Sequence, residues 1–180
     1  LGFFRIWSIP MHAVEGIMGR FQPAIAIHIQ EFAEKGKPVL GICNGFQILL
    51  EAGLLPGAMK RNDTLHFISK YHHLKVIDNN NEFLRLLNVG DVVNIPVAHH
   101  DGNYYIDEAG LKELEANNQI LLKYCTKDGE VTNMNGSVSN IAGICNKERN
   151  VFGLMPHPER AIEEILGSTD GVNMLKGLLK

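Results

Sequence analysis

The sequence predicts an α/β fold in layers with an inserted antiparallel portion. Residues 39–51 read as a buried strand, a sharp turn and a helix, which is a common unit of α/β folds. Around this unit the chain runs helix, strand, helix, then several strands, then helices, and that order favours a layered α/β arrangement. At 180 residues, with 45% hydrophobic and 21% charged residues, the chain suits one globular domain. We expect a single domain over residues 1–180.

The predicted helices have recognisable ends. One helix ends at Gly36, because Pro38 blocks its continuation. A second covers 107–117 and opens with acidic residues, and a terminal amphipathic helix opens with Ser168 as its capping residue. Residues 1–30 are the least legible part, compatible with a helix interrupted at Pro23.

The strands are predicted from short apolar runs between turn signals. A turn covers 53–57 and a polar loop begins at Asp78. The strand candidates are 39–42, 72–77, 92–97, 119–124, 138–145 and 151–155.

Composition and charge narrow the class of protein. A net charge of −3 gives no electrostatic argument for nucleic acid or an anionic membrane. Three cysteines, an odd number, do not form a disulfide framework and fit a reducing compartment. No stretch approaches a transmembrane span, and the first residues lack a signal-peptide pattern. We therefore expect a cytoplasmic protein.

Cys43 stands where the predicted strand turns into the helix. Small residues on both sides are typical of a nucleophile elbow, in which one side chain sits in a strained turn at the sheet edge. A helix N-terminus lowers the pKa of a thiol and favours the reactive thiolate. The alternative is that Cys43 is a small buried hydrophobe, the commonest state of a free cysteine.

A second unusual segment, Met155 to Arg160, follows the last predicted strand. Pro156 and Pro158 push the residues before them into extended conformations, so His157 and Glu159 should project to the same side. The carboxylate then fixes the imidazole tautomer, and the other ring nitrogen can serve Cys43 as a base. The alternative is a rigid surface turn. An early cysteine elbow together with a late His–Glu pair favours a catalytic triad.

Other polar residues receive simpler interpretations. His99, His100 and Asp101 do not complete a zinc-like spacing, so no metal site is expected. Gly136 and Ser137 either present groups to a ligand or make the turn into a strand, and the pattern favours the turn. The remaining candidates, read as structural or core residues, are His66, His72, His73, Cys125 and Cys145.

Four blocks of the sequence resemble the class I glutamine amidotransferases and, more narrowly, the PurQ family of glutaminase subunits of phosphoribosylformylglycinamidine synthase. The likeness runs from about residue 31 to 180. The blocks are G-I-C-N-G-F-Q-I-L-L-E-A-G-L-L-P-G-A-M (41–59), P-V-A-H-H-D-G-N-Y-Y (96–105), N-G-S-V-S-N-I-A-G-I (135–144) and G-L-M-P-H-P-E-R-A (153–161). The elbow and the late H-P-E indicate the class. Three features point to the narrower family: Asn44-Gly45-Phe46, the L-L-P-G-A-M run (54–59) and the A-H-x-x-G-N-Y-Y pattern of the second block.

The resemblance implies a chemistry and a set of site residues. Cys43 would attack the side-chain amide of glutamine, with His157 as base and then acid, oriented by Glu159. The Asn44 backbone N–H would be one donor to the oxyanion, and Gln47 looks like part of the glutamine site. Gly136 and Ser137 join the expected substrate-binding residues.

The resemblance also implies partners and an overall architecture. Ammonia would pass to a larger synthetase subunit that binds ATP and magnesium and converts formylglycinamide ribonucleotide to its amidine in purine biosynthesis. A small accessory subunit would help to assemble the complex. This chain itself is expected to bind no cofactor and no metal. The implied fold is a Rossmann-like three-layer domain with a mixed central sheet.

The sequence departs from the resemblance upstream of the elbow. Relatives begin with β-strands and a P-G-G-F-S type loop that supplies a second oxyanion N–H, and residues 1–30 match this only loosely. We therefore expect the N-terminal strands to be lacking, as in a truncated or frame-shifted reading of a longer gene. His100 stands where relatives often have glycine. Two rival interpretations are a stand-alone cysteine hydrolase acting on peptides or γ-glutamyl compounds, and an inactive fragment that only docks on the synthetase.

Overall fold

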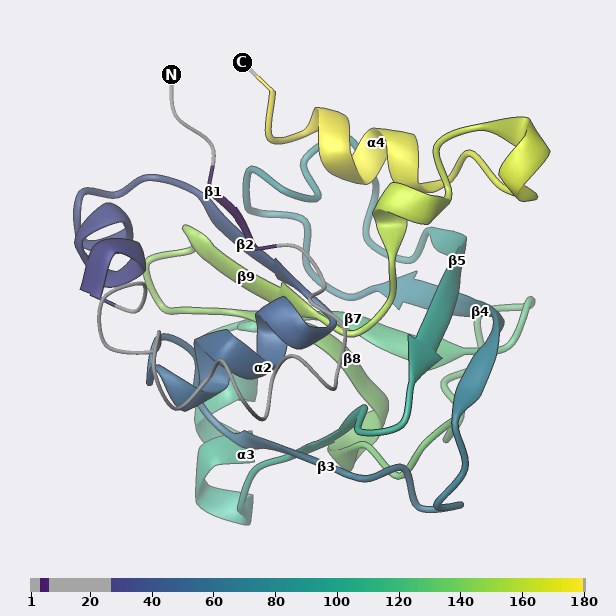
Figure 1. The fold of residues 1–180 in the computed structure, drawn as a ribbon, viewed down its shortest axis with the longest axis horizontal. Helices are drawn as coiled ribbons and strands as arrows, with labels where there is room; N and C mark the ends of the chain where they lie inside the picture. The colour runs from purple at the N-terminus through teal and green to yellow at the C-terminus, as the bar shows by residue number, and fades with distance from the viewer. Residues whose placement is uncertain (1–3, 7–26, 180) are drawn as a thin grey trace.

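A mixed seven-stranded sheet forms the centre of the protein in the computed structural model, which describes residues 4–6 and 27–179 (Figure 1). Its spatial order is β1-β2-β9-β8-β7-β4-β5. The first three strands run parallel, and each later neighbour pairs antiparallel. The strands are β1 (Phe4–Ile6), β2 (Val39–Ile42), β4 (Ile68–Val76), β5 (Val92–His99), β7 (Ile120–Cys125), β8 (Ile141–Cys145) and β9 (Val151–Leu154). A small second sheet pairs β3 (Ala58–Lys60) with β6 (Asn103–Tyr105).

Helices and short 3₁₀ turns accompany this sheet. The α-helices with both ends described are α2 (Asn44–Glu51), α3 (Glu108–Ala116) and α4 (Gly171–Lys176), and a further helix is described over 27–34. Short 3₁₀ turns cover Val138–Asn140, Pro158–Arg160 and Glu164–Leu166. None of the helices in the described ranges combines the length and the apolar character that a membrane crossing requires.

Two glycines let α2 approach the sheet closely. Gly41 of β2 and Gly153 of β9 are partners in the parallel register. A Cβ on Gly153 would lie 2.2 Å from the Phe46 ring, so only glycine leaves room for this helix. Phe152, the neighbour of Gly153, points to the opposite face of the sheet, where its ring meets that of Phe83 at 5.9 Å between centroids. Side chains therefore pack both faces, and the predicted three-layer arrangement is confirmed.

The sequence predicted most elements with small shifts at their ends. The strand predicted over 138–145 begins only at Ile141, because Ser139 and Asn140 have left-handed φ angles of 50° and 58°. Ser168 is not the cap of the terminal helix: Asp170 precedes α4, and the Ser168 hydroxyl instead accepts a hydrogen bond from the Asp170 N–H at 3.1 Å. β3 and β6 were not predicted, because three residues are too few for a periodic pattern.

The segment upstream of residue 37 is only partly as expected. The N-terminal strands were predicted to be lacking, but Phe4–Ile6 form β1, parallel to β2. The helix predicted to end at Gly36 is present, and Gly36 has a φ of 68°. The helix interpretation of residues 11–26 and the role of Pro23 lie outside the described residues.

Candidate active site

Cys43 occupies the turn between β2 and α2. Its φ of 54° and ψ of −109° form a strained conformation of the kind expected of a nucleophile elbow. The Cys43 N–H donates to the Leu154 carbonyl at 2.8 Å, and the Cys43 carbonyl accepts from Phe46 N–H at 2.9 Å. A Cβ on Gly41 would lie 2.6 Å from the Gly45 carbonyl oxygen, so the turn requires glycine there. The elbow predicted from the sequence is present.

The Cys43 thiol is buried, with only 5% of the residue exposed. Burial is the largest influence on its pKa, which it raises to about 11, while the Asn44 backbone N–H and Arg160 act in the opposite direction. The pKa was expected to fall at a helix N-terminus, and this expectation is wrong for the resting site because desolvation outweighs the backbone. The thiol is therefore neutral near pH 7 and needs a base.

His157 and Glu159 form the predicted pair. Nδ1 of His157 lies 2.7 Å from Oε1 of Glu159, and the imidazole is 1% exposed. A carboxylate accepts, so Nδ1 carries the proton and Nε2 presents a lone pair. Among the described residues, Nε2 has no hydrogen-bond partner. The predicted extended path is wrong in one respect: Pro158–Arg160 form a 3₁₀ turn, which brings the carboxylate back to the ring.

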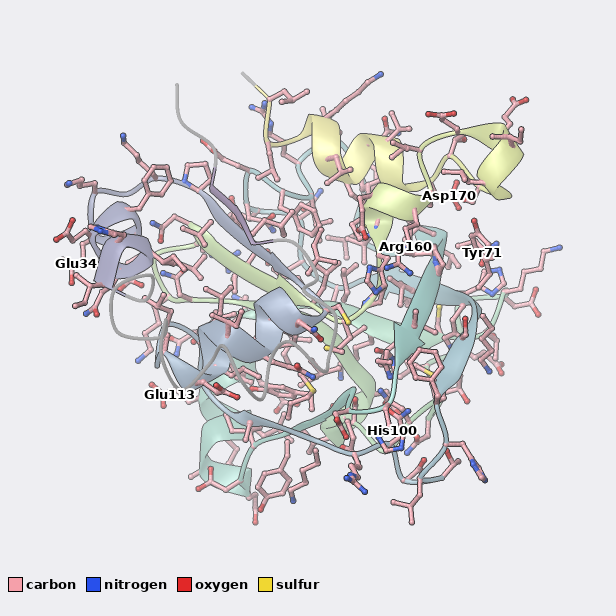
Figure 2. The ribbon with its side chains drawn as sticks, in the orientation of Figure 1. Glu34, Tyr71, His100, Glu113, Arg160 and Asp170 are labelled. Atoms are coloured by element: carbon pink, nitrogen blue, oxygen red, sulfur yellow. The ribbon has the colours of Figure 1, made fainter. Side chains whose placement is uncertain are left out.

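Cys43 and His157 follow the carboxyl ends of the neighbouring parallel strands β2 and β9, and both contact β5. The Cys43 sulfur lies 3.9 Å from the carbonyl oxygen of Ala98. Two residues earlier on the same strand, the Pro96 carbonyl accepts the His157 N–H at 2.8 Å. Figure 2 shows Arg160 in the segment that joins β9 to α4, beside β5. The sheet thus brings residues more than 100 positions apart to one site.

Gln47, one helical turn after Cys43, contacts the loop that follows β5. Its Nε2 donates to the Asp101 carbonyl at 2.8 Å. A cavity of about 450 Å³ opens beside this contact. Its lining residues are Gln47, Leu50, Glu51, Gly57, Ala58, Met59 and Asp101.

Ser137 bonds to the same loop, and Gly136 packs against Asn103, the first residue of β6. The Ser137 hydroxyl accepts from Tyr104 N–H at 3.0 Å and donates to the Gly102 carbonyl at 3.3 Å. Gly136 has a φ of 89°, and a Cβ there would lie 2.5 Å from the Asn103 side chain. These contacts agree with the turn that the local pattern favoured. Their role in substrate binding stays a prediction.

Two buried polar residues near the site were given no such role by the sequence. Asn62 is fully buried and His99 is 3% exposed, with Asn62 Oδ1 and His99 Nδ1 3.0 Å apart. His100 instead contacts Asp101 and the Leu65 carbonyl, at the opposite end of β5 from Val92 (Figure 2). No local pattern identifies Asn62, because its partners lie up to 40 positions away.

Comparison with known proteins agrees with this fold. The family of CobB/CobQ-like glutamine amidotransferase domains matches residues 10–172, so the chain is a class I glutamine amidotransferase domain by its family. The PurQ subunit of phosphoribosylformylglycinamidine synthase from Sulfurimonas denitrificans is 66% identical over 165 residues, covering 92% of this chain and 73% of that protein. The Aquifex aeolicus PurQ subunit is 56% identical over 86% of this chain and 70% of its own length. The chain belongs to the PurQ family.

Solved structures support the same assignment. A structure of PurLQS from Thermotoga maritima matches with a TM-score of 0.75 and 42% identity, covering 86% of this chain and 66% of that one. The present chain thus spans about two thirds of that relative. A glutamine amidotransferase from the same organism matches with a TM-score of 0.63 at 18% identity, and this likeness shows the fold alone.

Proposed function

We propose that this chain is the glutaminase subunit of phosphoribosylformylglycinamidine synthase and hydrolyses L-glutamine to glutamate and ammonia. One observation carries the proposal. Cys43 sits in a strained elbow at the carboxyl end of β2, and the His157–Glu159 pair follows the carboxyl end of the neighbouring strand β9. The 66% identity to a PurQ subunit supplies the substrate and the pathway.

Covalent catalysis by Cys43 accounts for the first half of the reaction. As the sulfur attacks the side-chain amide carbon of glutamine, the thiol proton moves to Nε2 of His157. The tetrahedral intermediate places its negative oxygen near the Asn44 backbone N–H. His157 then returns the proton to the amide nitrogen, ammonia leaves, and a thioester remains on Cys43.

Water completes the cycle. His157 Nε2 takes a proton from water as its oxygen attacks the thioester carbon, and the returning sulfur is protonated by His157 as glutamate leaves. Glu159 holds Nδ1–H throughout and stabilises the imidazolium. The raised pKa of Cys43 fits this scheme, because proton transfer coupled to attack avoids a buried thiolate at rest.

The product ammonia serves a synthetase partner. The likeness to PurLQS supports a complex with a large subunit and a small accessory subunit. ATP and magnesium would bind the large subunit, which makes formylglycinamidine ribonucleotide, and this chain would bind neither. The second oxyanion donor of relatives would come from a segment upstream of residue 37. Loss of one such donor elsewhere costs on the order of 10²–10³ in rate.

Cys43→Ala tests the proposal in the assembled complex. We expect glutamine hydrolysis to be slow in the isolated chain, to rise when the large and accessory subunits are added, and to vanish in the variant. Cys145→Ala is the matched control, because Cys145 is also buried but lies in β8, where its N–H donates to the Gln119 carbonyl. Ammonia release is the measurement.

Each other outcome selects another interpretation. Partner-stimulated ammonia release that survives Cys43→Ala would overturn the mechanism. Turnover of peptides or γ-glutamyl compounds without a partner would favour a stand-alone hydrolase. A complex that assembles but hydrolyses no glutamine would make the chain a docking subunit.

A further inference from the structure

Asn62 uses every hydrogen-bonding position of its side chain within the described structure. Nδ2 donates to the carbonyls of His66 and His99 at 2.8 and 2.9 Å. Oδ1 lies 3.2 Å from the Gly102 N–H and 3.0 Å from His99 Nδ1. Asn62 has no exposed surface, so water does not compete for these contacts.

These partners leave one orientation for the amide. Two carbonyls require donors, so Nδ2 must face His66 and His99. The Gly102 N–H requires an acceptor and must therefore face Oδ1. Because Oδ1 can only accept, the proton of the neutral His99 ring must be on Nδ1. Asn62 thus fixes the tautomer of His99.

Nε2 of His99 consequently carries an acceptor lone pair in the protein interior. Its Nε2 is buried and has no hydrogen-bond partner among the described residues. The pKa of His99 is lowered to about 4, mainly by burial and then by the charge of His157, while a backbone hydrogen bond and Asp101 act in the opposite direction, so the ring is neutral at pH 7. A buried acceptor without a donor is costly unless a ligand supplies the donor.

The same asparagine shapes the loop beside Gln47. The Gly102 N–H bonded to Asn62 follows Asp101, whose carbonyl accepts from Gln47. Gly102 also lies directly against the His99 ring, since a Cβ there would be 2.2 Å from Nδ1. Asn62 and Ser137 therefore both bond to Gly102: Asn62 accepts from its N–H, and Ser137 donates to its carbonyl.

We propose that Asn62 is a positioning residue of the glutaminase site: it holds loop 99–102 against Gln47 and fixes His99 so that Nε2 accepts a hydrogen bond from bound glutamine. This inference rests on the proposed glutaminase function and assigns Asn62 to substrate binding. A purely structural asparagine would change stability without changing affinity for glutamine.

Asn62→Ala in the complete complex tests the assignment. We expect KM for glutamine to rise at least about tenfold while kcat falls less than about threefold, because the Cys43–His157 machinery is left intact. The matched control is Asn150→Ala. Asn150 also donates to two carbonyls, Ala33 at 2.7 Å and Lys37 at 3.2 Å. It lies just before the start of β9, whereas Cys43 contacts the other end of that strand. Thermal unfolding of both variants separates lost stability from lost binding.

A second variant, Asn62→Asp, keeps the acceptor and adds a negative charge beside His99. The carboxylate raises the pKa of His99, so the cationic ring forms as pH falls toward neutrality. We expect KM to rise at the acidic end of its pH profile and to recover as pH increases. Aspartate differs from asparagine by one polar group, so this readout does not depend on the alanine variant folding.

The outcomes are distinguishable. If Asn62→Ala and Asn150→Ala change KM equally at equal loss of stability, or if the pH profile of the Asn62→Asp complex matches wild type, Asn62 is structural only and the inference is overturned. If the wild-type complex itself hydrolyses no glutamine, the proposed function fails first.

Discussion

Cys43 shows how burial and catalysis oppose each other in a single side chain. The elbow places the sulfur at the start of α2, where backbone N–H groups favour a thiolate, yet burial raises the pKa to about 11. In the proposed mechanism the thiol therefore depends on proton transfer to His157. That dependence makes the tautomer of His157 decisive, and Glu159 is the group that sets it.

Glu159→Gln should reverse the tautomer of His157. A glutamine amide can donate to Nδ1, which moves the ring proton to Nε2 and removes the base for Cys43. We expect kcat of the assembled complex to fall by about 10²-fold or more, as loss of the orienting carboxylate does in serine protease triads. KM for glutamine should change little.

The control for this change is Glu163→Gln, an exposed residue in the same segment. Steady-state ammonia release measures both variants. A Glu159→Gln complex with wild-type kcat would mean that Glu159 does not orient the base.

At the scale of elements, the close packing of α2 on β2 and β9 determines where the elbow lies. Gly41 and Gly153 face each other in the register, and both meet side chains of α2. Glycine in a strand usually weakens it, so its presence at both positions indicates that helix approach is the requirement.

Gly41→Ala should push α2 away from the sheet. The added Cβ would lie 2.5 Å from Leu49 Cδ1 and 2.6 Å from the Gly45 carbonyl oxygen. The backbone contact cannot be relieved by a side-chain rotation, so we expect a loss of about 1–3 kcal/mol in the free energy of unfolding. kcat should also fall, because the helix carries the Asn44 N–H.

Gly36→Ala separates these effects. Gly36 has open space around it but a φ of 68°, so alanine there should cost about 1 kcal/mol in stability through backbone strain alone. Its kcat should equal that of the wild type. Urea unfolding and ammonia release measure the two quantities, and a Gly41→Ala protein that is as stable and as active as wild type would contradict the packing argument.

The residues that could be predicted from the sequence are those with a local signal. The elbow around Cys43 and the proline-flanked His157 are short patterns, and each is present in the structure. Asn62 could not be found in this way, because the role proposed for it depends on contacts with His99 and Gly102, which lie 37 and 40 positions away in the sequence. The pKa of Cys43 was predicted in the wrong direction for the same reason, since burial is a property of the assembled fold.

At the scale of the whole molecule, Arg149 connects three loops at the end of the sheet opposite to Cys43. Its guanidinium donates to Asp78 Oδ1 at 2.6 Å and to the carbonyls of Asn80, Asn117 and Asn118 at 3.0, 3.3 and 3.0 Å. Arg149 and Asp78 are only 22% and 20% exposed. Solvent therefore screens this pair less than an ordinary surface ion pair.

Arg149→Ala should lower the stability of the whole domain without changing its chemistry. Loss of the guanidinium leaves a mostly buried carboxylate and three carbonyls without their donor, so we expect a loss of about 2–3 kcal/mol in the free energy of unfolding. Lys147→Ala, in the same turn, removes an exposed pair with Glu113 and should leave the free energy of unfolding nearly unchanged, because solvent screens that pair. Urea unfolding measures both, and kcat at saturating glutamine should stay at the wild-type value, because Arg149 lies at the start of β9 whereas Cys43 contacts its end. Equal midpoints for the two variants would show that the Arg149 contacts do not stabilise the fold.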